Sequence, residues 1–347
     1  GEERRRVMRG PLGDRLGRLR ALYGSILIYS VGTLLNGLVD SVETYALCRL
    51  LAGFGLAGEL GAAVTLVSET LPQSRRGLGT TLVAGFGLCG GVAAALLAEW
   101  LSWRTCYFVG GSAGLLLLFL RLSVAEPQMF VDVKQQSVRR GSLALLLATA
   151  TRRRRFLQLL LIGLPVWFVA GIVIAFSPEL STALGTQGVT AARAVLISYI
   201  GVALGDLLCG VLSQVLKSRR RAMLWSLSLL LVLLLLLLRL HGLGLHGFYA
   251  LCFGLGLSTG YWAVLVTTAA EQFGTNLRAT VTTTVPNLVR ASVIPLGLLY
   301  QQLVPTLGTV GSVRWLGGLC VAVAVVSLWL LPETYHRELA FLEHESR

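Results

Sequence analysis

The chain has 347 residues, of which 14% are charged and 54% are hydrophobic, and its mean hydropathy is +0.73. A soluble protein carries about a quarter of its residues as charges, so the composition excludes an ordinary soluble domain. The net charge is +13, but Lys and Arg stand in short stretches between apolar segments. This distribution argues against nucleic-acid binding, which clusters them on a soluble face.

Ten apolar segments are predicted to be membrane helices, because a helix needs about 20 apolar residues to cross a bilayer. In chain order they span residues 22–40, 46–69, 78–98, 104–121, 156–176, 194–216, 222–240, 247–270, 280–302 and 311–331. The connection 122–155 is long and polar and includes the run Arg152–Arg155. It is the predicted boundary between two helix bundles.

The positive charges predict the orientation in the membrane. If alternate connections lie on opposite sides, one side collects 24 of the 30 Lys and Arg residues. The positive-inside rule makes that side cytoplasmic and places both ends of the chain there. We therefore expect a multi-pass, monomeric protein of a cell membrane, namely a bacterial inner membrane, with the lipid bilayer as its surroundings.

An internal repeat divides the chain into two halves. Residues 10–22 (GPLGDRLGRLRAL) correspond to residues 210–222 (GVLSQVLKSRRRA), and residues 69–81 (ETLPQSRRGLGTT) correspond to residues 271–283 (EQFGTNLRATVTT). The offsets are 200 and 202 residues, so the two matches agree in order and spacing. Two similar halves are typical of secondary transporters.

The repeat also predicts the domain organisation of an all-α protein with two pseudo-symmetric bundles. Two predicted helices precede or run into the second copy, whereas only nine residues precede Gly10. We therefore expect twelve helices in the full protein, with the first two absent here; a genuine ten-helix protein is the alternative. The expected units are residues 1–121 (helices 3–6), a cytoplasmic linker 122–155, and residues 156–347 (helices 7–12 and a cytoplasmic tail).

Residues 10–22 resemble the loop signature of the major facilitator superfamily between helices 2 and 3. Leu19 departs from that signature, and Gln214 replaces the acidic residue in the second copy. The two Glu-x6-Arg elements and Pro332-Glu333-Thr334 resemble the sugar porter and organic ion transporter branch. The stretch 85–91 contains no proline, unlike the drug–proton antiporter branch.

The resemblance implies a secondary active transporter that moves a small organic solute, either sugar-like or an organic anion, by alternating access. Proton-coupled symport is the expected mode, with protons as the second partner. A non-transporting receptor or scaffold on the same fold and a multidrug efflux carrier are the alternatives. An uptake assay would separate transport from scaffolding, because one fold hosts many functions.

Seven charged residues at the predicted cytoplasmic ends of helices suggest a gate. They could form ion pairs that join the two halves in one state of the transport cycle, or they could be solvated surface charges. In the resembled family such residues stabilise the state open to the outside. The candidate gating residues are Asp14, Arg18, Glu69, Arg76, Glu271, Arg278 and Glu333.

Four charged residues stand out at membrane depth within the predicted helices, because a charge is disfavoured by at least ~2.5–3.5 kcal/mol at the helix centre. Glu59 could take up a proton or face a cation, and Arg290 could hold a substrate carboxylate. Arg49 and Asp206 are further candidates, and structural ion pairing across the bundle is the alternative for all four.

Polar and aromatic residues in the last helices complete the predicted substrate site. Tyr261 and Trp262 could contact a small organic ligand, and Asn287 follows a proline that interrupts its helix. Packing is the alternative for the aromatic residues. The four His residues form neither a metal-ligand set nor a catalytic triad, so we expect no enzymatic activity, no metal site and no cofactor.

Overall fold

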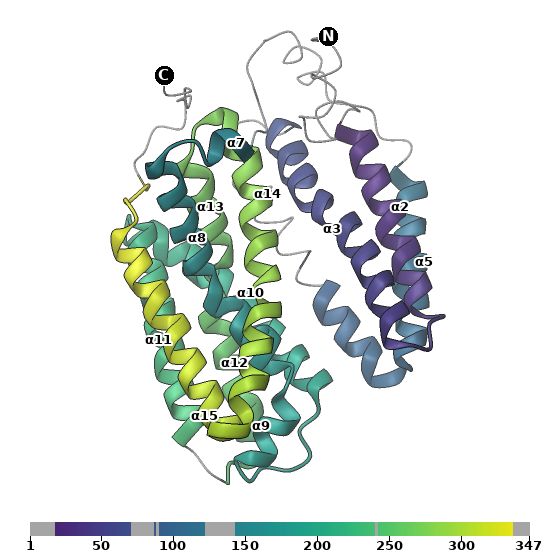
Figure 1. The fold of residues 1–347 in the computed structure, drawn as a ribbon, viewed down its shortest axis with the longest axis vertical. Helices are drawn as coiled ribbons and strands as arrows, with labels where there is room; N and C mark the ends of the chain where they lie inside the picture. The colour runs from purple at the N-terminus through teal and green to yellow at the C-terminus, as the bar shows by residue number, and fades with distance from the viewer. Residues whose placement is uncertain (1–17, 71–86, 88–89, 122–142, 240–241, 336–347) are drawn as a thin grey trace.

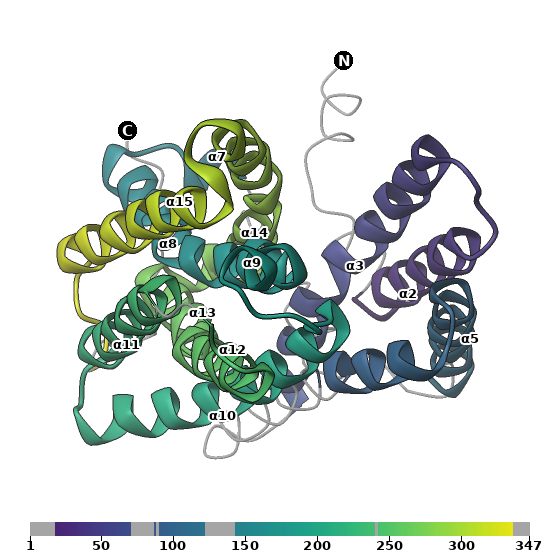
Figure 2. The ribbon, with the colours of Figure 1, turned by 90° about the horizontal axis from the view of Figure 1, so that it is seen from below.

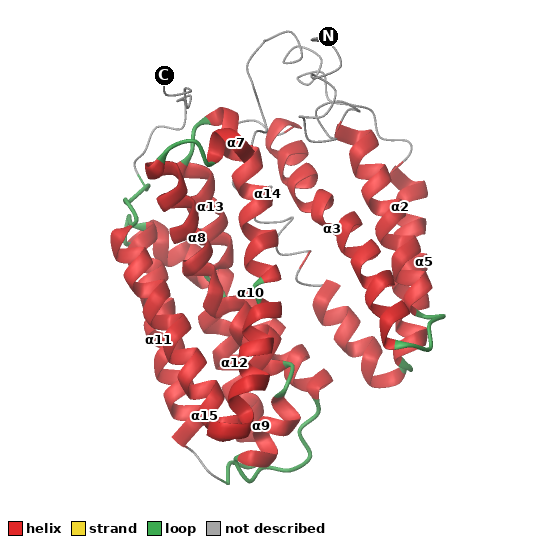
Figure 3. Cartoon of the chain, in the orientation of Figure 1, coloured by secondary structure: helices red, strands yellow, loops and turns green. Residues whose placement is uncertain are grey.

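The computed structural model describes residues 18–70, 87, 90–121, 143–239 and 242–335. Within these ranges all regular elements are helices, with no strand (Figure 3). Six helical segments of the described part are long and apolar enough to cross a membrane. The prediction of an all-α, membrane-spanning protein is confirmed.

The first bundle contains α2 (Arg18–Asn36), α3 (Val42–Thr70), the helix Gly90–Trp100 and α5 (Trp103–Arg121) (Figure 1). Small residues allow these helices to pack closely. The Ser25 hydroxyl of α2 donates a hydrogen bond to the Gly55 carbonyl of α3. Such contacts matter in a membrane, because lipid removes the hydrophobic drive between helices and leaves close packing and hydrogen bonds to join them.

The second bundle is larger and lies beside the first (Figures 1 and 2). In chain order it contains α7 (Leu143–Leu146), α8 (Ala150–Phe168), the π-helical turn η2 (Val169–Ile174), α9 (Ser177–Ala183), α10 (Ala191–Val215), α11 (Arg219–Arg239), α12 (Leu245–Thr259), α13 (Trp262–Gln272), α14 (Thr275–Ala291) and α15 (Val293–Leu330).

The last two predicted helices are present but divided differently. Ser292 keeps a helical conformation, so α14 and the start of α15 form one continuous crossing. Gly308 then breaks α15 with φ 68° and ψ 170°, a backbone conformation that is essentially restricted to glycine. The rest of α15 returns across the bundle.

Two further boundaries differ from the sequence prediction. Helix α8 begins at Ala150 rather than near residue 156, because the Thr149 side chain accepts a hydrogen bond from the Arg152 N–H and caps the helix. The Arg152–Arg155 run is therefore helical. The predicted helix 247–270 is interrupted between α12 and α13, where Gly260 and Tyr261 leave the α-helical conformation.

Glycines bring α10 and α12 into backbone contact. A Cβ added at Gly205 would lie 2.1 Å from the Leu257 carbonyl oxygen, and one at Gly256 would lie 2.0 Å from the Ser198 carbonyl oxygen. Only glycine fits at these positions without moving a helix. The paired spacing is the small-residue packing seen between membrane helices.

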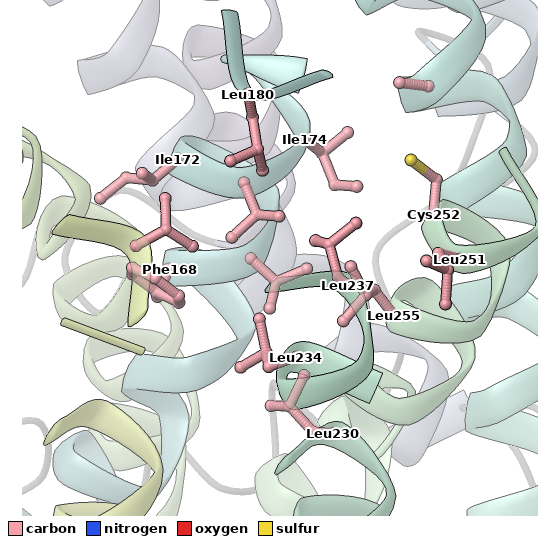
Figure 4. Packing of buried hydrophobic residues seen from close by; sticks show 14 of the residues in the cluster. Phe168, Ile172, Ile174, Leu180, Leu230, Leu234, Leu237, Leu251, Cys252 and Leu255 are labelled. Atoms are coloured by element: carbon pink, nitrogen blue, oxygen red, sulfur yellow. The ribbon is translucent and has the colours of Figure 1, made fainter. Parts of the chain in front are cut away.

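Buried apolar side chains of the second bundle form two clusters. The first packs Phe168, Ile172 and Leu234 from α8, η2 and α11 (Figure 4). The second surrounds Tyr261 and Phe273, both fully buried. These clusters fix α8, α11 and α13 relative to one another.

The two ends of the molecule differ in charge. We call the end at which α2, α8, α11 and α14 begin the basic end, because Arg152–Arg155 and Arg219–Arg221 lie there; the other is the far end. The bundles meet where α3 contacts α14. Near the far end, Arg193 Nε of α10 lies 3.0 Å from Glu99 Oε1 of the first bundle.

Candidate functional site

Arg290 lies at mid-depth in the second bundle. It is 15 residues after the start of α14, about 22 Å along the axis, and the same helix continues into α15 beyond it. Its Nε is buried and has no hydrogen-bond partner among the described residues. A mid-membrane cation with an unused donor is the feature from which the candidate site is built.

Trp167 of α8 provides the surface against which Arg290 lies. The Arg290 guanidinium carbon is 5.2 Å from the centroid of the Trp167 ring, within the range of a cation–π interaction. Trp167 is 17 residues after the start of α8, about 25 Å along the axis. The two residues therefore reach the same depth from the basic end.

Two glycines, one in α8 and one in η2, allow the close approach of α14 and the start of α15 that this contact requires. A Cβ added at Gly163 would lie 2.7 Å from Val289, and one at Gly171 would lie 2.7 Å from Val293. Each valine thus fills the space left by a missing side chain. Because Val289 precedes Arg290 directly, this packing fixes the arginine opposite Trp167.

The site borders the first bundle. Tyr199 of α10 is close enough to interact electrostatically with Arg290, and a Cβ added at Gly91 would lie 2.6 Å from the Tyr199 ring. Glu59 lies 11 residues before the end of α3, about 16 Å from the basic end, and α3 contacts α14. The structure describes the Glu59 backbone only.

Asn287 lies one turn from the candidate site. Its Nδ2 donates to the Thr283 carbonyl oxygen at 2.9 Å, beside Pro286, whose missing N–H leaves a gap in the hydrogen bonds of α14. Asn287 therefore supports the interrupted helix. The structure does not place a ligand contact on it.

Tyr261 and Asp206 have structural partners. Tyr261 is fully buried, and its hydroxyl donates to the Ile162 carbonyl oxygen of α8 at 2.8 Å. Asp206 Oδ1 accepts the Ala263 N–H at 3.0 Å, at the first turn of α13. Since the first N–H groups of a helix lack internal partners, Asp206 acts as their cap across the break. Trp262, at that same break, is partly buried against the second cluster.

Arg49 lies apart from Arg290, near the far end of the first bundle. Its Nε donates to the Tyr45 hydroxyl at 3.1 Å, and its guanidinium carbon is 5.2 Å from the Tyr107 ring centroid. Tyr45 and Tyr107 are hydrogen-bonded at 2.7 Å and pack edge-to-face with Trp103. Aromatic residues in this position are typical of the membrane–water interface.

At the basic end, Glu271 pairs within its own bundle. Its Oε1 lies 3.2 Å from Arg219 Nη2, and its Oε2 accepts the Thr334 hydroxyl at 2.6 Å. Arg278 donates from Nε to the Ala270 carbonyl oxygen at 3.0 Å and interacts electrostatically with Glu271. These contacts join α13, α11 and the segment after α15.

Glu333 caps α11. Its carboxylate accepts the Ser218 hydroxyl and the Arg219 and Arg220 N–H groups, the latter two at 3.0 and 3.2 Å. An anion at a helix N-terminus is favoured by the free N–H groups and the helix dipole. Burial opposes ionisation, but the hydrogen bonds outweigh it, so the pKa of Glu333 lies below its ordinary value.

The predicted gate between the halves lies partly outside the described residues. Asp14 and Arg76 fall there, and Arg18 and Glu69 are described by their backbone only, at the basic ends of α2 and α3. The gate remains a prediction. The three candidate gating residues of the second bundle, Glu271, Arg278 and Glu333, contact residues of that same bundle. The sequence repeat alone did not reveal these contacts.

Two functional candidates were missed by the sequence reasoning. Trp167 lies in an apolar stretch, and no local pattern distinguishes it from a packing residue. The Glu99–Arg193 contact joins residues 94 positions apart, and no local pattern marks such a pair.

The fold defines a class of protein: a polytopic membrane protein of two helix bundles with a cation at mid-depth. The family is shown by the sequence, since the model of the Major Facilitator Superfamily matches residues 7–298. The chain belongs to this superfamily and is a transporter rather than an enzyme. Among the described residues, no group of three or more His, Cys, Asp or Glu could hold a metal ion.

Similar proteins carry transporter names. A probable 4-methylmuconolactone transporter of Cupriavidus pinatubonensis is 28% identical over 344 residues, covering 94% of this chain and 77% of the relative. The 3-(3-hydroxy-phenyl)propionate transporter of Escherichia coli is 29% identical, covering 78% and 67%. The sialic acid transporter NanX of Escherichia coli is 31% identical over 129 residues, and the match spans only 36% of this chain and 32% of NanX.

Among solved structures, the Escherichia coli fucose:proton symporter FucP has a similar fold. The TM-score is 0.65 over 92% of this chain and 85% of that chain, at 15% sequence identity. A second FucP structure, in the outward conformation, gives a TM-score of 0.64. At this identity the likeness concerns the fold alone, and it confirms the two-bundle architecture.

Proposed function

We propose that this protein moves a small organic anion across the membrane by alternating access, coupled to protons, with Arg290 as the group that binds the anion. The proposal rests chiefly on one observation, the buried Arg290 Nε without a hydrogen-bond partner among the described residues. A guanidinium at this depth is disfavoured unless its charge and donors are used. A substrate carboxylate would supply both.

The residues around Arg290 favour a carboxylate with an apolar or aromatic body. A guanidinium matches a carboxylate through two parallel hydrogen bonds. The Trp167 ring, 5.2 Å from the guanidinium, offers a flat apolar surface beside that anion. Two similar proteins are named for carboxylic acids, sialic acid and 3-(3-hydroxy-phenyl)propionate, which supports the same class here.

Uptake of radiolabelled 3-phenylpropionate and of its uncharged amide into proteoliposomes tests the anion site. Arg290→Gln should weaken transport of the acid by at least about 30-fold, the effect of leaving a buried charge unpaired, while Arg290→Lys keeps part of it. Arg239→Gln is the matched control, since Arg239 is an exposed arginine in the last turn of α11. Equal transport of the acid by wild type and Arg290→Gln would refute the assignment.

Glu59 is the proposed proton-carrying group. It lies on α3, which contacts α14, and a carboxyl between a low-dielectric setting and a cation can change protonation with conformation. Glu59→Gln should abolish proton-driven accumulation and leave substrate exchange measurable. If Glu59 only pairs structurally, the variant would instead lower the folded yield and leave the pH dependence of transport unchanged.

A further inference from the structure

A groove of about 400 Å³ lies between α8 and α15, away from the candidate substrate site. It begins at the basic end with Arg154 and Leu330 and reaches Leu161, seven residues along α8, about 10 Å deeper. Gln158, which lines the groove, and Trp167 are nine residues apart on α8, two and a half helical turns. They therefore lie on opposite faces of α8, and the groove faces away from Arg290.

The groove combines an apolar wall with three polar residues near its basic end, Arg154, Gln158 and Ser327. Leu157, Leu161 and Val326 form part of the wall. Arg154 is exposed at the mouth. Gln158 lies one turn deeper, has only 6% of its surface exposed, and its Nε2 has no hydrogen-bond partner among the described residues.

A buried amide without a partner is unfavourable by about 1–3 kcal/mol. The unpaired Gln158 amide therefore indicates that a polar group of a ligand belongs in this groove. Arg154 differs from its neighbours, because Arg152 and Arg153 donate to the Leu145 and Leu147 carbonyl oxygens. Arg154 alone of the run Arg152–Arg155 lines the groove.

We propose that the groove binds one anionic glycerophospholipid of the surrounding bilayer, with its phosphate at Arg154, an ester carbonyl at the Gln158 amide, and an acyl chain along Leu161 and Val326. Charge complementarity favours this occupant, since basic residues at the edge of a membrane helix attract anionic lipids. Arg154 and Gln158 are one helical turn apart, about 5–6 Å, which suits the separation of a phosphate from the glycerol esters.

Native mass spectrometry of the delipidated protein, titrated with phosphatidylglycerol or phosphatidylcholine, tests the proposal. Wild type should bind one phosphatidylglycerol more tightly than phosphatidylcholine. Arg154→Gln should weaken phosphatidylglycerol binding about fivefold and remove the preference between the two lipids. Arg153→Gln, which removes the same charge one residue away, should leave binding unchanged.

Gln158→Leu separates the amide from the charge. It should weaken binding of both lipids, because both carry the ester carbonyl, and it should raise the melting temperature of the lipid-free protein. Excess inorganic phosphate should not displace the lipid; displacement would identify a site for soluble anions and overturn the proposal. Equal binding by wild type, Arg154→Gln and Gln158→Leu would also overturn it.

Discussion

Gly205→Ala should destabilise the second bundle by forcing α10 and α12 apart. The new Cβ would lie 2.1 Å from the Leu257 carbonyl oxygen and 3.0 Å from Gly260 Cα, whereas non-bonded heavy atoms prefer about 3.5–4.0 Å. Both neighbours are backbone, so no side chain can turn away. Overpacking of this kind is unfavourable by about 1–3 kcal/mol.

Two other glycines provide the matched controls. Gly210 lies on the same helix with nothing within 4 Å of an added Cβ, and the nearest atoms to a Cβ added at Gly254 belong to the Leu233 side chain, at 3.1 Å and beyond. All three substitutions to Ala gain the same helix propensity, up to about 1 kcal/mol. The difference between Gly205→Ala and Gly210→Ala therefore isolates the overpacking energy, and Gly254→Ala should fall near Gly210→Ala.

The assay is equilibrium unfolding in mixed micelles titrated with SDS and followed by circular dichroism. The expected order of stability is Gly210→Ala and Gly254→Ala at or above wild type, and Gly205→Ala about 1–3 kcal/mol below Gly210→Ala. If Gly205→Ala and Gly210→Ala unfold at the same SDS fraction, α10 and α12 do not pack through their backbones, and the reasoning fails.

Three further predictions follow from the described contacts. The pKa of Glu333 is lower in the folded protein than in the unfolded chain, where it is about 4.3. The resulting stability is present above the unfolded-state pKa and is lost as pH falls through the folded-state pKa. The free energy of unfolding of Glu333→Gln should therefore vary less with acid pH than that of wild type. Asp206→Asn keeps an acceptor for the α13 N-terminus and should be nearly as stable as wild type, whereas Asp206→Ala should lose about 1 kcal/mol; loss of proton-driven accumulation in a stable Asp206→Asn variant would contradict a purely capping role. An impermeant maleimide added to intact cells should label Gln187→Cys at the far end and not Ala148→Cys at the basic end, and the reverse pattern would invert the predicted orientation.

The helices could be predicted because a membrane crossing requires a long apolar run whatever its partners are. The break between α12 and α13 could not, because Gly260 and Tyr261 stand inside such a run and only the fold supplies the Asp206 carboxylate that satisfies the exposed N–H groups. Hydropathy reports the transfer of side chains into lipid, and it does not report backbone hydrogen bonds made between distant helices.

The candidate site was predicted in part for the same reason. Arg290 stood out because a cation in an apolar run is unusual on energetic grounds alone. Tyr261 also stood out, yet its hydroxyl bonds the Ile162 carbonyl oxygen, and a buried tyrosine with a structural partner looks the same in sequence as one that meets a ligand. Trp167 became visible only when Gly163 brought α8 against α14.

The turn at Gly308 has a consequence for how the protein enters the membrane during synthesis. Residues Thr280–Leu330 form one 51-residue apolar stretch that folds back at a single glycine, so its two crossings can leave the translocation machinery as a helical hairpin. Arg290 on its own is disfavoured in the bilayer by at least ~2.5–3.5 kcal/mol, and insertion together with the apolar second crossing would offset that cost. A Gly308→Val change, which disfavours the required positive φ, should therefore lower the fraction of molecules whose C-terminal helices insert, before any effect on the finished transporter is seen.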